Sequence, residues 1–153
     1  MDTNETDSTI DAAVKTKQQQ FLARTIHRWQ FLLTGARAEL HAQDWSAAID
    51  IYQDAHALAE FLVHIADCKN CAIKNYVRTL IEYGYILCKS GRPGMLSPLI
   101  ELAHQTLLCY ATPRLAEQLL KPVLSLVEAN NWQRDLWINQ LFAGDAVQQG
   151  AVH

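Results

Sequence analysis

The chain has 153 residues, half of them apolar, with 13 Lys and Arg, 16 Asp and Glu and a net charge of −3 at pH 7. This length buries enough apolar surface for one domain without disulfide or metal staples. The acidic balance and the scattered basic residues argue against a nucleic-acid-binding protein, which needs a basic face. No apolar run reaches the ~18 residues of a membrane-spanning helix and the N-terminus is polar, so we expect a cytoplasmic protein with no membrane partner.

The chain begins with an acidic stretch that is rich in Thr and Ser and has no apolar periodicity. We therefore predict a disordered tail over residues 1–14. From Lys15 onward, apolar residues recur with helical spacing in every segment as far as Gly144. The sequence thus predicts a single all-α domain over residues 15–144, followed by a frayed tail over residues 145–153.

The helix boundaries are predicted from capping and helix-breaking residues. The expected spans are 15–42, 45–66, 72–89, 95–110, 113–130 and 132–142. Asp44 is a predicted N-cap, and the next break is placed within 67–70, where residues of modest helix propensity gather. The alternative is a helix that continues through Cys71, with the turn nearer residues 74–75. Pro122 is expected to kink or split the fifth helix. Gly84 lies inside the third helix, where glycine costs ~1 kcal/mol, so it is expected to have a packing reason.

The second predicted helix carries small and aromatic residues along one stripe. Four of these residues match the aromatic, small, aromatic and small positions of a tetratricopeptide (TPR) hairpin: Trp45, Ala48, Tyr52 and Ala55. The stretch over residues 34–107 therefore resembles two TPR hairpins, which implies antiparallel αα-hairpins stacked as a short superhelix. Gly35, where the family has a large residue, and the turn at 92–94 depart from the pattern. A compact helical bundle is the alternative, because any antiparallel bundle shows the same spacing.

In a TPR-like stack the first helix of each hairpin lines the concave groove, so the resemblance implies a site on the first and third helices. The outward positions there are Arg37, Asn75, Arg78, Glu82 and Tyr85. Arg and Tyr are favoured at interfaces. We therefore predict a non-enzymatic adaptor or chaperone-like protein that binds another protein, as a peptide or a partner helix, in this groove. The last helix is expected to cap the stack or to form a homodimer face through Trp132, Trp137 and Leu141.

Histidine and cysteine residues at helical spacing suggest an alternative function. His64, Cys68 and Cys71 supply three metal ligands if the helix ends among them, with His104 or Cys88 as a fourth. The same Cys-x-x-Cys pair is a redox motif, although it lacks the preceding strand of thioredoxin-like proteins. A metal- or redox-responsive sensor is therefore the alternative hypothesis. With no export signal, the four cysteines are expected to be reduced.

No constellation of catalytic residues stands out in the sequence. Glu101 and His104 form a Glu-x-x-His motif, but it occurs once, whereas di-iron bundles need it twice. The serines lie in no nucleophile-elbow context, and no phosphate-binding loop is present. We therefore expect neither enzymatic activity nor a cofactor.

Overall fold

The computed structural model describes residues 3–151, and side-chain burial within residues 6–146. Every regular element in this part of the chain is helical, so the predicted all-α class is confirmed. The elements are α1 (Thr3–His41), α2 (Trp45–Ile65), α3 (Lys69–Lys89), the 3-10 turn η1 (Pro93–Met95), α4 (Leu96–Leu108), α5 (Pro113–Glu128) and α6 (Asn131–Ala151). A search of the described residues finds no helix both long and apolar enough to cross a bilayer.

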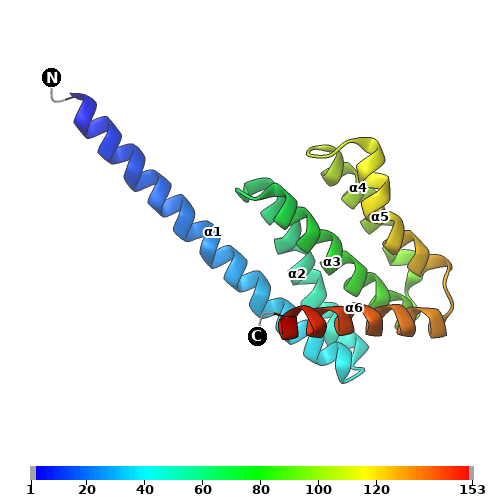
Figure 1. The fold of residues 1–153 in the computed structure, drawn as a ribbon. Helices are drawn as coiled ribbons and strands as arrows, with labels where there is room; N and C mark the ends of the chain where they lie inside the picture. Colours follow the sequence, from blue (N-terminus) through cyan, green and yellow to red (C-terminus); the bar gives the residue numbers. More distant parts are fainter. Residues whose placement is uncertain (1–2, 152–153) are drawn as a thin grey trace.

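Helices α1 to α5 run alternately up and down, and α6 crosses the lower part of the molecule from α5 toward α1 (Figure 1). The packing between these helices is uneven. α2 packs extensively on both α1 and α3, whereas α3 contacts α5 more than it contacts α4, its neighbour in sequence. The succession of antiparallel helices agrees with the prediction, while regular TPR-like stacking stays a prediction.

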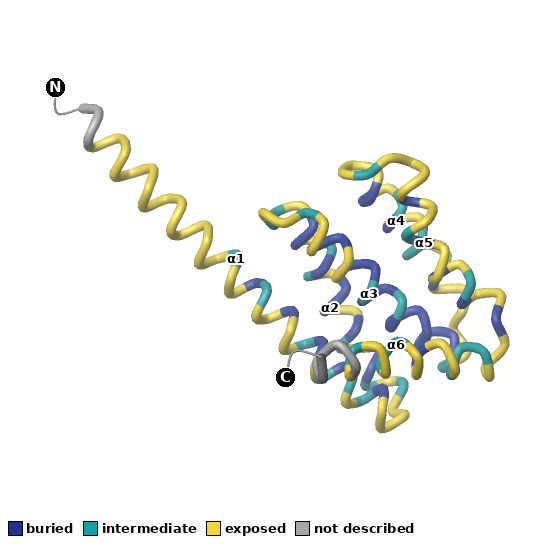
Figure 2. Tube along the Cα trace, in the orientation of Figure 1, coloured by how far each residue is buried: buried dark blue, intermediate teal, exposed yellow. Residues whose placement is uncertain are grey.

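The core follows the apolar stripes that the sequence predicts, with α3 at its centre. Ala48, Tyr52 and Ala55 of α2 have no exposed surface. Of the 21 residues of α3, 13 are buried, because other helices cover it on several sides (Figure 2). A helix so enclosed also buries positions that lie off its apolar stripe.

Gly84 has the packing reason that its place inside a helix predicts. A Cβ atom at this position would lie 3.2 Å from Cδ1 of Leu96 and 3.6 Å from Cδ1 of Leu126. Leu96 begins α4 and Leu126 lies on α5, so the missing side chain lets both helices approach α3 closely. The expected packing role is confirmed.

Two predicted helix starts and one predicted break are also confirmed. The side chain of Asp44 accepts a hydrogen bond from the backbone N–H of Ala47 at 3.2 Å, and Thr112 caps α5 in the same way. The break between α2 and α3 covers residues 66–68 and so overlaps the predicted 67–70, with Cys68 as the N-cap of α3, which begins at Lys69 rather than at residue 72. These caps satisfy N–H groups that a helix cannot bond internally.

Several boundaries differ from the predictions. α1 begins at Thr3 rather than at Lys15, so residues 3–14 are helical and not a disordered tail, although every side chain from 6 to 21 is exposed. Extending an existing helix requires no new nucleation, so the chain continues α1 even through residues of modest helix propensity. α5 continues through Pro122, so the proline does not split the helix, while the predicted kink stays a prediction. Pro122 lies on the exposed side, where water can bond the carbonyl that proline leaves free.

The last helix is also longer than predicted. α6 passes through Gly144 and ends at Ala151, so the predicted helix end at residue 142 is wrong. Residues 145–151 are helical and not the predicted frayed tail. Nothing lies within 4 Å of a Cβ placed at Gly144, so this glycine marks neither a turn nor a close approach. Residues 1–2 and 152–153 of the two predicted tails lie outside the described part of the chain.

Candidate interaction site beneath the last helix

The carboxylate of Glu82 is the centre of a polar network inside the protein. Glu82 lies on α3 and has no exposed surface. Its Oε1 accepts hydrogen bonds from Nε of Arg37 and from the hydroxyl of Tyr52, each at 2.8 Å. Its Oε2 accepts from Nη2 of Arg37 and from Nε of Arg78, again at 2.8 Å. A buried carboxylate is costly unless charge and hydrogen bonds compensate it, and here two guanidinium groups and a hydroxyl do so.

Three helices supply this network. Arg78 and Glu82 lie four residues apart on α3 and so share one face, while Arg37 comes from α1 and Tyr52 from α2. The hydrogen bonds to Glu82 raise the pKa of Arg37. Burial, together with the negative charge of Glu82, raises the pKa of Tyr52, so its hydroxyl remains a donor. The hydrogen bonds of this network tie α1, α2 and α3 together.

The C-terminal part of α6 covers this network with one aromatic and one acidic side chain. Arg78 binds Asp145 in a bidentate pair, with Nη1 3.1 Å from Oδ1 and Nη2 2.7 Å from Oδ2. The guanidinium carbons of Arg37 and Arg78 lie 5.6 and 5.4 Å from the ring centroid of Phe142. Phe142 also contacts the ring of His41, with centroids 4.9 Å apart. One turn of α6 thus offers a ring and a carboxylate to two arginines.

A second contact fixes the beginning of α6 to α3. Asp135 accepts a hydrogen bond from the hydroxyl of Tyr85 at 2.8 Å and pairs with Nζ of Lys89 at 3.1 Å. Burial acts to raise the pKa of Asp135, but the bonds from Tyr85 and Lys89 outweigh it, so the pKa is lowered. Next to it, Nε of Arg134 donates to the carbonyl of Leu126 at 2.8 Å.

The structure thus brings together most of the predicted partner-binding residues, but not as an open groove. Arg37, Arg78 and Glu82 form one network, and Tyr85 lies on the same helix beneath α6. The prediction that all of them face outward is wrong for Glu82 and Tyr85, which are buried. Asn75 is exposed near the start of α3 and takes no part in this network.

Sequence reasoning missed the two residues of α6 that complete the site. Phe142 stood at the predicted end of the last helix, and Asp145 fell in the predicted tail. The available signal was their spacing of three, which places an aromatic and an acidic side chain on one helical face.

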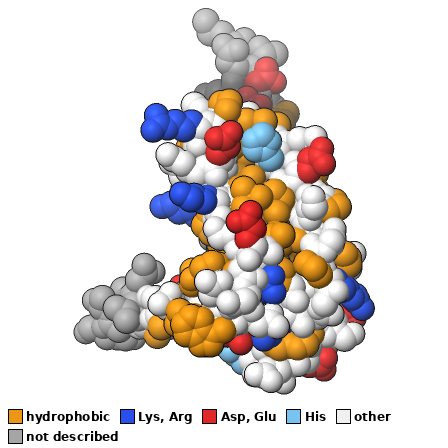
Figure 3. All heavy atoms as spheres, turned by 90° about the vertical axis from the view of Figure 1, so that its right-hand side faces the viewer, with side chains coloured by type: hydrophobic (Ala, Val, Ile, Leu, Met, Phe, Trp, Pro, Cys, Tyr) orange, Lys and Arg blue, Asp and Glu red, His pale blue; other side chains and the backbone are white. Residues whose placement is uncertain are grey.

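The residues predicted for a homodimer face lie nearer the beginning of α6, before Phe142 and Asp145. Trp132 is 72% exposed and Trp137 is 38% exposed, whereas Leu141 is partly buried against the core. Trp137 and Leu141 also border an apolar hollow of about 350 Å³ between α3, α5 and α6. Figure 3 views the side of the molecule that lies on the right in Figure 1. Hydrophobic side chains form a band on this side. The exposed apolar residues of α4 and α5 are Leu102, Leu108, Leu115, Leu124 and Val127.

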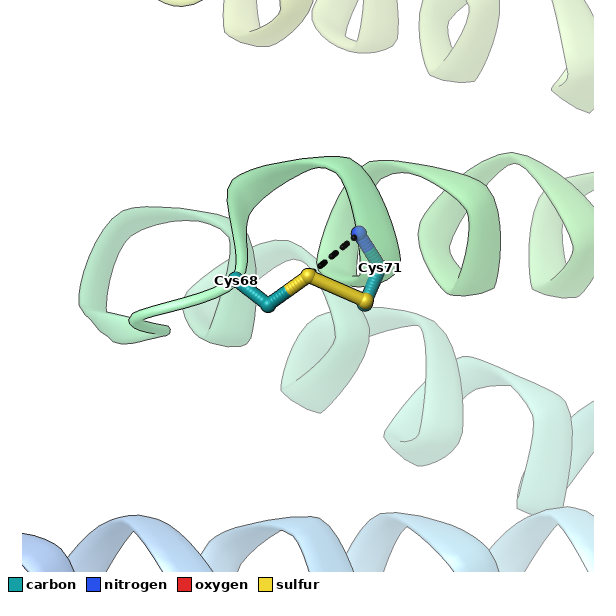
Figure 4. The surroundings of a disulfide bond; sticks show 2 residues. All are labelled: Cys68 and Cys71. Atoms are coloured by element: carbon teal, nitrogen blue, oxygen red, sulfur yellow. Dashed lines mark hydrogen bonds between the residues drawn. A yellow bond between two sulfur atoms is a disulfide. The ribbon is translucent and has the colours of Figure 1, made fainter.

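His64, Cys68 and Cys71 are not arranged as a set of metal ligands. Cys68 and Cys71 are joined by a disulfide (Figure 4), which corrects the expectation that all four cysteines are reduced. Nδ1 of His64 instead lies 2.6 Å from the hydroxyl of Tyr110. Among the described residues, no group of three or more His, Cys, Asp and Glu side chains is placed to hold a metal ion. The metal-site hypothesis is therefore not supported by this arrangement.

Comparison of the chain with protein-family models, with curated proteins and with solved structures gives no match. The resemblance to TPR hairpins therefore stays a prediction.

Proposed function

We propose that the protein is a non-enzymatic interaction module that binds an amphipathic helix of a partner protein on the surface formed by α1 and α3. The observation that carries this proposal is how α6 is bound. Its Phe142 packs on Arg37 and Arg78, and its Asp145 pairs with Arg78. A surface that holds one helix through its side chains has the shape and chemistry to hold another.

The contacts of α6 define what such a partner helix would carry. A guanidinium group matches a carboxylate in a bidentate pair, and its flat face stacks on an aromatic ring. Phe142 and Asp145 supply these two groups one turn apart. The expected ligand is therefore a helix with an aromatic residue followed three residues later by an acidic one.

The limited contact between α6 and α3 supports the replacement of α6 by such a helix. α6 packs on α3 much less extensively than α2 does. The side chain of Asp145 is 38% exposed and that of Arg78 is 21% exposed. Ion pairs with this exposure stabilise by only about 0.2–1 kcal/mol. Detachment of α6 would cost far less than unfolding of the domain, and a partner helix would shift the equilibrium toward the open form.

A peptide with the sequence of residues 131–146 tests the proposal. Its binding is measured by fluorescence anisotropy to the wild-type protein and to a Phe142→Ala/Asp145→Asn variant, in which the intramolecular contact is weakened. We expect the variant to bind the peptide at least about tenfold more tightly, because its own α6 competes less well.

Two controls make the result specific. A peptide with the same Phe142→Ala and Asp145→Asn changes should bind neither protein. An Asn139→Ala/Gln140→Ala variant, changed on the exposed side of α6, should behave as the wild type. If the unchanged peptide binds the weakened variant no better than the changed peptide does, the proposed helix-binding surface is wrong.

A homodimer is the second candidate, favoured by the exposure of Trp132. A tryptophan that is 72% exposed leaves a large apolar area in water, and Trp137 lies one to two turns along the same helix. Sedimentation velocity at micromolar concentration should then give the mass of two chains, and Trp132→Ala/Trp137→Ala should give one. A single-chain mass for the wild-type protein would remove this candidate. For either role we expect a cytoplasmic location, which a fluorescent fusion tests.

A further inference from the structure

The disulfide between Cys68 and Cys71 lies at the turn between α2 and α3 (Figure 4). Cys68 is the N-cap of α3, and its Sγ accepts a hydrogen bond from the backbone N–H of Cys71 at 3.3 Å. Both cysteines are exposed. A thiol of another molecule can therefore reach the bond without any rearrangement of the helices.

This disulfide joins no two helices. Its cysteines are three residues apart within one helical turn, so it closes one of the shortest possible loops and removes little chain entropy. The connection between α2 and α3 is held independently, because Nζ of Lys69 donates to the carbonyls of Val63 and His64 at 2.8 Å each. The bond is thus dispensable for the fold, and its placement suits reversible chemistry.

Cys68 lies at the N-terminus of α3, at the positive end of the helix dipole. The N–H groups of the first helical turn point at the N-cap, and the helix dipole is positive there. Cysteines at helix N-termini have lowered thiol pKa values and react readily as nucleophiles or leaving groups. The hydrogen bond from Cys71 shows that the Cys68 sulfur already occupies this place.

An apolar hollow of about 270 Å³ adjoins the two cysteines, which form part of its lining. The other walls come from α1, α2 and α3. Their main apolar residues are Leu22, Ile26, Trp29, Ala59, Leu62 and Ala72. Asn75, one of the residues predicted to bind a partner, stands at the same hollow. An apolar side chain seated there would place the neighbouring residues of its own chain beside the disulfide.

We propose that Cys68 and Cys71 exchange their disulfide with a dithiol of a partner polypeptide, in which a cysteine lies next to apolar residues that enter this hollow. This activity is separate from helix binding beneath α6 and does not depend on it.

The exchange takes place in two steps. A thiolate of the partner attacks Sγ of Cys68, the Cys68–Cys71 bond breaks, and Cys71 leaves as a thiolate that takes up a proton. The second thiolate of the partner then attacks the partner sulfur of the mixed disulfide and releases Cys68. The partner loses two electrons and two protons, and the cysteine pair gains them. The reverse direction reduces a partner disulfide.

The test uses the reduced, full-length Cys71→Ser/Cys109→Ser variant, in which Cys68 is the remaining exposed thiol. The probes are two synthetic peptides, each with one cysteine activated as a pyridyl disulfide. One peptide has Leu and Phe beside the cysteine, and the other has Ser and Asn. Attack by Cys68 releases pyridine-2-thione, which absorbance records. We expect the apolar peptide to react about tenfold faster, with the adduct mapped to Cys68.

Two further variants test whether Cys68 belongs to an exchange site or is only a reactive thiol. In the Cys109→Ser protein with Cys71 intact, the adduct should resolve to the Cys68–Cys71 disulfide and release the peptide. An Ala66→Leu change in the hollow should abolish the preference for the apolar peptide while the circular dichroism spectrum stays unchanged. Equal rates for the two peptides, no adduct at Cys68, or a pair that excess dithiothreitol does not reduce would each overturn the proposal.

Discussion

Arg78 binds Glu82 and Asp145 with different edges of one guanidinium group. Its Nε lies 2.8 Å from the buried carboxylate of Glu82, and its Nη2 lies 2.7 Å from the carboxylate of Asp145 on α6. The same side chain therefore belongs both to the network that joins α1, α2 and α3 and to the contact that holds the last helix. A ligand that replaces Asp145 meets an arginine already oriented by Glu82.

The buried network should be strongly stabilising as a unit. We expect Glu82→Gln to lower the free energy of unfolding by about 3 kcal/mol, because two guanidinium groups lose their buried counter-charge. Urea unfolding followed by circular dichroism measures this loss. Glu101→Gln, on the exposed side of α4, is the matched control and should change the value by less than about 0.5 kcal/mol. Similar values for the two variants would show that the network contributes little.

Two glycines inside helices should respond oppositely to alanine. Gly144→Ala should raise the free energy of unfolding by about 0.5–1 kcal/mol, because alanine favours the helix and nothing obstructs its Cβ. Gly84→Ala should gain nothing or lose about 1 kcal/mol, since its Cβ would press on buried Leu96 at 3.2 Å. Thermal or urea unfolding of both variants checks the difference. An equal gain from both would mean that α4 retreats from α3 without cost.

His56 should make the protein sensitive to acid. Its ring is buried between Tyr76 and Tyr83, its Nε2 has no hydrogen-bond partner, and burial lowers its pKa to about 4. The pKa of an unfolded histidine is about 6.5, so below that pH the unfolded chain binds a proton that the folded chain does not. Above pH 6.5 His56 does not lower the free energy of unfolding. As the pH falls from 6.5 toward 4, this free energy decreases.

The pH effect can be measured by urea unfolding at pH 7 and pH 5. Between pH 7 and pH 5 the free energy of unfolding should fall by about 2 kcal/mol more for the wild-type protein than for His56→Leu. Uptake of one proton by the unfolded chain lowers this free energy by about 1.4 kcal/mol per pH unit below 6.5. His27→Gln, changed at an exposed position on α1, should keep the wild-type loss. If His56→Leu loses as much as the wild type, the acid sensitivity has another source.

Features decided by neighbouring residues were predictable from the sequence. The Asp44 cap, the buried stripe that includes Tyr52, and the packing role of Gly84 depend on residue type and helical spacing within a few turns. The same local information predicted the helix order. It failed at residues 3–14, where α1 continues without apolar periodicity and the side chains from residue 6 onward are exposed, so the pattern gives no signal.

The site itself depends on contacts between distant parts of the chain. Glu82 is separated by 45 residues from Arg37, and Arg78 by 67 residues from Asp145. A glutamate off the apolar stripe is normally exposed, and only the convergence of three donor side chains shows why this one is buried. The path of α6 across α3 determines that Tyr85 is covered. A Cys-x-x-Cys pair, likewise, is compatible with free thiols, metal ligands or a disulfide until the turn around it is known.

The proposed function requires that α6 lie on a helix-binding surface and leave it while the rest of the fold stays intact. Native-state amide hydrogen exchange measures this opening directly. The amides of residues 135–145 should exchange with an opening free energy several kcal/mol below that of α3, and Asp145→Asn should lower the value for α6 alone. Exchange of α6 and α3 at the same free energy, in both the wild type and the variant, would contradict the account.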